Sequence, residues 1–163
     1  MVMSMIATVA IALGLSPSLN AGSGIVAMDV GADGSSTAQL TIDQSSINFA
    51  SANPRAVSLI ASTPASVNVT ANAQIDSQST ATLTVVADGD LVSGSDVIPI
   101  GKVSWTATGD GFAPGTMDKS PVSAGSWLGP GEHTGTFSFF LTNSWSYAVG
   151  NYSQTVHYTL TAP

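Results

Sequence analysis

The chain has 163 residues, enough for one domain, and 8% of them are charged, against roughly 25% in an average globular protein. Three basic residues stand against ten acidic ones, for a formal net charge of −7, so the clusters of Lys and Arg that bind nucleic-acid phosphates or an anionic bilayer are missing. Cysteine is absent, which excludes disulfides, thiol catalysis and Cys-ligated zinc.

The N-terminal residues read as a targeting segment. Residues 1–15, MVMSMIATVAIALGL, are almost wholly apolar, and SPSLNAGS follows them. We therefore predict a secretory signal peptide over residues 1–21, cleaved after Ala21. The apolar run is short for a membrane span, which needs about 20 residues. An assembly helix of a filament protein and a buried or anchoring segment are the alternatives.

Short alternating segments rich in Val, Ile, Thr and aromatic residues follow Ala21, separated by Gly, Pro, Asn, Asp and Ser. Alternation with a period of two predicts β-strands that bury one face. The expected strands are 25–30, 37–43, 46–50, 56–61, 66–73, 80–87, 97–109 (long enough for two), 135–142 and 151–161.

No segment shows the apolar spacing of an amphipathic helix, and strands and helices do not alternate. The pattern predicts an all-β fold, an antiparallel immunoglobulin-like β-sandwich of about eight or nine short strands. We expect residues 37–163 to form this domain and residues 22–36 to form an N-terminal extension.

The Gly- and Pro-rich connection 109–133 leaves two interpretations open. A long unstructured loop is often functional, but two weak edge strands with a Gly-rich turn fit the sequence equally well. Trp127 lies there between Gly125 and Gly129, and we expect it to be an exposed surface contact. Trp105, flanked by polar residues in an expected strand, is expected in the core, and Trp145 is expected to pack over the end of the fold.

The last strand has the clearest alternation. Tyr152, Val156, Tyr158 and Leu160 share one parity, and Ser, Thr and His occupy the other. We expect the first set to face a core. The sequence does not decide whether the neighbouring strand belongs to the same chain or to another molecule.

Residues that could carry chemistry are few. His133 and His157 have no recognisable nucleophile motif around them, and most carboxylates lie in turns, where they bond to nearby backbone. We therefore expect no enzymatic activity and no cofactor. A weak calcium site is the one metal hypothesis, because three aspartates lie close together in the sequence and oxygen ligands suit this ion. They are Asp88, Asp90 and Asp96.

Two segments together resemble the WxL cell-surface domains of bacteria. They are residues 81–109, ATLTVVADGDLVSGSDVIPIGKVSWTATG, and the terminal GNYSQTVHYTLTAP. Gly150, Tyr152, Leu160 and Pro163 match the closing pattern of that family, and Tyr158 stands where its second Trp would be. The resemblance covers most of residues 37–163. It implies a wall-associated surface protein.

A weaker resemblance is to the pilus subunits of chaperone–usher systems, which carry a glycine 14 residues from the end before an alternating strand. Gly150 holds that place. The resemblance implies that GIVAMDV, residues 24–30, acts as a donor strand that completes the sheet of a neighbouring subunit. The residues expected to take part in strand exchange are Ile25, Val26, Met28 and Val30 on the donor, and Tyr152, Val156, Tyr158 and Leu160 on the last strand.

These observations predict an exported, non-enzymatic protein that works outside the cell or at a bacterial cell surface in a structural or adhesive role. Its partners would be cell-wall or surface-protein components or, in the alternative of a fimbrial subunit, identical subunits in a filament. A glycan-binding module that uses Trp127 is a weaker third hypothesis. No partner nucleic acid is expected, and no membrane span after cleavage of the signal peptide.

Overall fold

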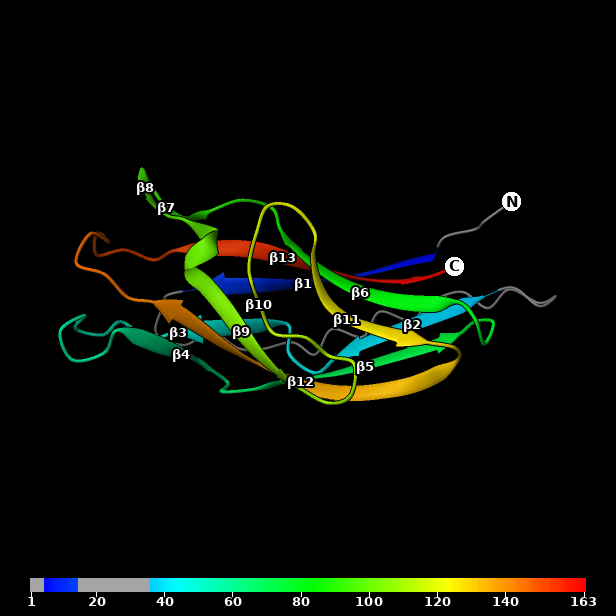
Figure 1. Ribbon diagram of the computed structural model, residues 1–163. Coiled ribbons are helices and arrows are strands. Elements are labelled where there is room, and N and C mark those ends of the chain that lie inside the picture. The colour runs from blue at the N-terminus through cyan, green and yellow to red at the C-terminus, as the bar shows by residue number, and fades with distance from the viewer. Residues whose placement is uncertain (1–4, 15–35) are drawn as a thin grey trace.

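The structure is a computed structural model that describes residues 5–14 and 36–163. Apart from one short 3₁₀ turn, the regular elements in these ranges are all β-strands, arranged as two layers (Figure 1). The layer that we call the β13 sheet runs in the order β11 (Val122–Leu128), β6 (Thr80–Ala87), β13 (Ser153–Ala162), β1 (Met5–Gly14), β3 (Ser46–Phe49). The layer that we call the β12 sheet runs in the order β10 (Gly115–Thr116), β9 (Val103–Thr108), β12 (Gly131–Thr142), β5 (Val67–Gln74), β2 (Thr37–Ile42).

Pairing is antiparallel throughout the described strands except between β1 and β3, which run parallel. Strand β4 (Leu59–Thr63) connects the two layers, because its first part pairs with the end of β12 and its last two residues pair with β3. Strands β7 (Leu91–Ser93) and β8 (Asp96–Ile98) form a hairpin beside the start of β13. The 3₁₀ turn η1 (Ile100–Lys102) leads from this hairpin into β9.

One hydrophobic core lies between the layers. Alternate residues of β13 are buried, and so are alternate residues of β5, β6 and the second half of β12. Phe137 of the β12 sheet stacks on Tyr158 of the β13 sheet with ring centroids 6.2 Å apart. Two sheets that face one another across such a core are arranged as in a β-sandwich.

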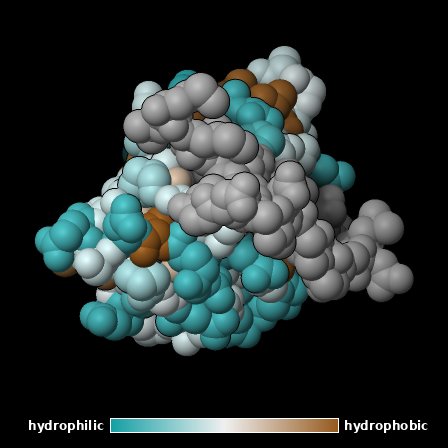
Figure 2. Space-filling view, turned by 90° about the vertical axis from the view of Figure 1, so that its right-hand side faces the viewer, coloured by the Kyte–Doolittle hydropathy of each residue, from teal (hydrophilic) through white to brown (hydrophobic). Residues whose placement is uncertain are grey.

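The two ends of the molecule differ. At one end the Ser36 hydroxyl donates a hydrogen bond to the carbonyl oxygen of Pro163 at 2.5 Å, so β2 begins where β13 finishes. Where described residues are visible at this end, hydrophilic side chains predominate (Figure 2). The opposite end holds the β7–β8 hairpin and the segments 50–58 and 143–152 (Figure 1).

Every strand expected from residue 37 onward is present, with ends displaced by a few residues. The connection 109–133 contains β10 and β11, which are edge strands of the two sheets, as in the second interpretation of that segment. Strands β1 and β7 do not correspond to any expected strand. The expected strand 25–30 lies outside the described residues.

Candidate functional site

The β13 sheet contains a strand whose sequence we predict to be part of a cleaved leader. Strand β1 pairs with β13 along its whole length, from Met5 opposite Ala162 to Gly14 opposite Ser153. On its other side it pairs with β3 over three positions, Ala12–Gly14 with Ser46–Asn48. We call the backbone position between β13 and β3 the β1 slot.

The β13 side of the slot is formed by a strand with a fully buried face. Val156 and Leu160 are each 0% exposed, and Tyr158 is 2% exposed. Burial raises the pKa of the Tyr158 phenol well above its usual range. Tyr152, one residue before β13, is also buried and donates its hydroxyl to the carbonyl oxygen of Ala148 at 3.0 Å. All four residues expected on the last strand therefore have their side chains in the core.

The register makes β1 the strand that joins β3 to β13. Within residues 5–14 and 36–163, β3 pairs only with β1 and with two residues of β4. Without a strand in the slot, the β1-facing edge of β13 would carry a row of unpaired backbone N–H and C=O groups beside the core. Such an edge favours pairing with another chain. The donor-side residues Ile25, Val26, Met28 and Val30 lie outside the described residues.

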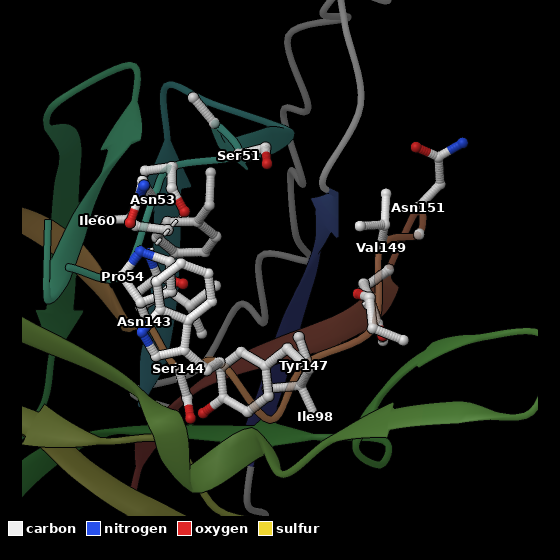
Figure 3. A pocket seen from close by; sticks show the side chains of 18 residues that line it. Ser51, Asn53, Pro54, Ile60, Ile98, Asn143, Ser144, Tyr147, Val149 and Asn151 are labelled. Carbon is white, nitrogen blue, oxygen red and sulfur yellow. Dashed lines mark hydrogen bonds between the residues drawn. The ribbon is translucent and has the colours of Figure 1, made fainter. Parts of the chain in front are cut away.

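A cavity of about 890 Å³ opens at the end of the slot where Gly14 pairs with β13. Its walls come from the segment after β3 and from the segment between β12 and β13. Figure 3 shows Pro54, Asn143 and Tyr147 on one side of this pocket and Val149 and Asn151 on the other. The Asn143 side-chain amide holds the two segments together, donating to the carbonyl oxygens of Ala52 and Val57, each at 2.9 Å.

The expectation that Trp127 is exposed is wrong. Its side chain is 6% exposed, and its indole N–H donates to the carbonyl oxygen of Asp110 at 2.8 Å. The ring packs edge-on against Phe112 and stacks on His133, with centroids 4.8 and 5.0 Å away. The cause is a β-bulge between Ser123 and Gly125, which shifts the parity of β11 and turns Trp127 toward the core.

The tryptophan that is exposed is Trp145, at 72%. We expected it to pack over the end of the fold. Instead it forms part of the pocket wall, while Tyr147, two residues later, packs against the core. Trp105 is 3% exposed, which confirms its expected place in the core.

The three candidate calcium ligands do not form a site. Asp90 accepts the backbone N–H of Ile100 and pairs with Lys119, each at 2.9 Å. Asp88 contacts the imidazole of His157 at 2.8 Å. Among the side chains that the structure describes, no group of three His, Cys, Asp or Glu residues is placed to hold a metal ion. Asp88 and Asp90 bond to nearby groups of the protein instead.

In residues 5–14 and 36–163, no hydrogen bond joins either histidine to a serine or threonine hydroxyl. His133 stacks on Trp127, and His157 contacts the Asp88 carboxylate at the surface of β13. Glu132 lies on an exposed position of β12, where the Asn72 amide donates to it at 3.4 Å. These contacts are those of surface and packing residues.

Comparisons with protein-family models, with curated proteins and with solved structures found no match. Among the described residues, no helix has the length and apolar character required to cross a membrane. The assignment of function therefore depends on the slot and on the pocket at its end.

Proposed function

We propose that the protein is an exported, non-enzymatic structural subunit of a bacterial surface assembly and that its copies join by β-strand exchange. In this proposal, cleavage after Ala21 removes β1 with the leader, and residues 24–30 of another copy enter the β1 slot. The observation that carries the proposal is that the strand between β13 and β3, Met5–Gly14, lies inside the predicted leader. We also propose that the two layers form an immunoglobulin-like sandwich, which the layer-crossing β4 supports.

The donor segment has the alternation that the slot requires. Val26, Met28 and Val30 share one parity, and Asp29 falls on the other. The β13 residues with buried side chains alternate in the same way, and residues directly opposite on adjacent strands project to the same side of a sheet. A donor with Val26, Met28 and Val30 opposite this buried set would face the core with apolar side chains and leave Asp29 on the solvent side.

Chain length favours a donor from another copy. The slot covers ten residue positions, so its two ends are about 30 Å apart at roughly 3.3 Å per residue. Ser36 lies at the Pro163 end, whereas a segment that fills the slot in the direction of β1 finishes at the pocket end. Residues 31–35 can span at most about 21 Å between Val30 and Ser36. A donor that reaches the pocket end in this direction must therefore belong to a different molecule.

Mass spectrometry and light scattering on the whole chain, expressed with export in a bacterial host, test this function. We expect a mature N-terminus at Gly22 and a series of multimers. Met28→Asp should reduce the multimers to monomers or small species, because a carboxylate would enter the core face of the slot. Ala27→Asp is the matched control, since residue 27 has the opposite parity, and it should assemble like the unchanged protein.

Two results would contradict the proposal. One is a monomer that keeps residues 5–14, which would make β1 a permanent part of the fold. The other is a processed monomer whose thermal stability does not change in Met28→Asp. The latter result would instead agree with the self-sufficient fold of a WxL-like, wall-associated domain, which stays a prediction from the sequence.

A further inference from the structure

The pocket at the end of the slot has an uncharged wall that combines aromatic rings with amide and hydroxyl groups. Among the residues that the structure describes, those that line it include no Asp, Glu, Lys, Arg or His. Its polar side chains are mainly Asn53, Asn143 and Asn151, with Ser51 and Ser144, and its aromatic rings include Trp145 and Tyr147. The cavity volume of about 890 Å³ falls in the range of small-ligand sites, about 300–1,000 Å³.

Trp145 is the aromatic residue of this wall that is open to solvent. It is 72% exposed, whereas Trp105 and Trp127 are 3% and 6% exposed. A large ring exposed beside a cavity is a surface on which an apolar face can stack. The C–H faces of a sugar ring provide such a surface, and its hydroxyls pair with amides and hydroxyls.

The wall is held in place before any ligand arrives. Asn143 ties the segment after β12 to Ala52 and Val57, and the Asn53 carboxamide oxygen accepts the backbone N–H of Arg55 at 2.9 Å. The Tyr147 phenol can donate a hydrogen bond at neutral pH, as an ordinary tyrosine does, and burial raises its pKa further above that range. A wall that is already ordered loses less conformational entropy of its own when a ligand binds.

We propose that this pocket binds a neutral oligosaccharide, with Trp145 as the stacking surface and Asn53, Tyr147 and Asn151 as the hydrogen-bonding groups. The uncharged character of the described wall residues favours uncharged sugars over phosphorylated or acidic ones. The inference does not depend on strand exchange. It gives the molecule a glycan-binding function at Trp145, in place of the expected one at Trp127.

Fluorescence titration of the mature protein purified from the whole expressed sequence tests the site. The probes are lactose, maltose, chitobiose and the methyl glycosides of mannose, galactose and N-acetylglucosamine. At least one probe should shift the emission of Trp145 to shorter wavelength in a saturable way. The same probe should bind Trp145→Ala at least about tenfold more weakly by calorimetry. Leu128→Ala is the control, because Leu128 is also exposed, at 68%, but does not line the pocket.

Thermal unfolding of Trp145→Ala separates loss of the site from loss of the fold. We expect an unchanged midpoint, because the side chain is mostly in solvent. The inference is overturned if no probe binds saturably up to about 10 mM, which corresponds to a free energy near −3 kcal/mol. Equal binding by Trp145→Ala and the unchanged protein would also overturn it. If the substitution alters only the distribution of multimers, the exposed ring belongs to a contact between subunits.

Discussion

Trp127 is buried because glycines make room for its ring. A Cβ added at Gly125 would collide with the indole carbons, and one added at Gly111 would collide with the indole nitrogen. Gly111 also has a φ of +77°, which favours glycine. The sequence shows both glycines as parts of a Gly-rich connection. Their contact with the Trp127 ring could not be predicted, because it requires β11 to pack over the turn that contains Gly111.

The first prediction compares the buried and the exposed tryptophan. Trp127→Ala should lower the free energy of unfolding by about 3–5 kcal/mol, because it removes a packed ring and leaves a cavity. Trp145→Ala should change it by less than about 0.5 kcal/mol. Urea unfolding followed by circular dichroism measures both variants against the unchanged protein. Similar losses for the two variants would mean that Trp145 is covered in solution.

At the scale of elements, most of the longer strands from β2 to β13 could be predicted from the sequence. Each of them buries one face, and this burial appears in the sequence as an alternation with a period of two. Short strands such as β7 and β10 could not, since two or three residues carry no period. The bulge in β11 hid the burial of Trp127, because one extra residue reverses the parity. The apolar composition of residues 5–14 suits a leader and a strand equally. Their pairing with β13 depends on contacts some 150 residues away in the sequence.

Asp90 links three elements and gives a prediction about acid stability. Its carboxylate accepts the Ile100 N–H at the start of η1 and pairs with Lys119 of the β10–β11 connection. These hydrogen bonds lower the pKa of Asp90 below its ordinary value of 3.8, and the bond from the Ile100 N–H has the larger effect. The folded carboxylate therefore takes up a proton at lower pH than the unfolded one. Its stabilising contribution is complete above the unfolded pKa and is lost as the pH falls through the folded pKa.

Asp90→Asn should accordingly lower stability at pH 7, by about 1 kcal/mol for weakened hydrogen bonds to a charged acceptor. It should also flatten the decline of the unfolding midpoint between about pH 5 and pH 2. Thermal unfolding across this pH range measures both effects. Asp76→Asn, in the exposed turn before β6, serves as the control. Parallel declines in Asp90→Asn and the unchanged protein would show that the Asp90 contacts contribute nothing.

At the scale of the whole molecule, the proposed strand exchange would give assembly a direction, because the two ends of the molecule differ. Ser36, the residue before β2, lies at the Pro163 end, so the chain enters β2 from that end. Strand β1 fills the slot and runs from the Pro163 end toward the pocket end. A donor segment that runs in the same direction would leave the slot at the pocket end, so the domain that supplies it would lie beyond that end. Exchange between unlike ends is heterologous, and a heterologous contact that does not close into a ring produces an open filament.

Paired cysteines test this direction, and the absence of native cysteine makes the test clean. If residue 30 takes the place of Leu13, so that the donor reaches the pocket end, residue 27 takes the place of Ala10 and lies opposite His157, on the outward parity of β13. Adjacent strands bring such positions within the Cα separation of a disulfide, about 4.4–6.8 Å. Ala27→Cys combined with His157→Cys should therefore give a ladder of multimers on a non-reducing gel, and reducing agent should collapse it. Each single variant should give no ladder beyond a dimer, because one cysteine per chain cannot link a series. A disulfide confined to monomers would place residues 24–30 in their own slot, parallel to β13, and would exclude the filament.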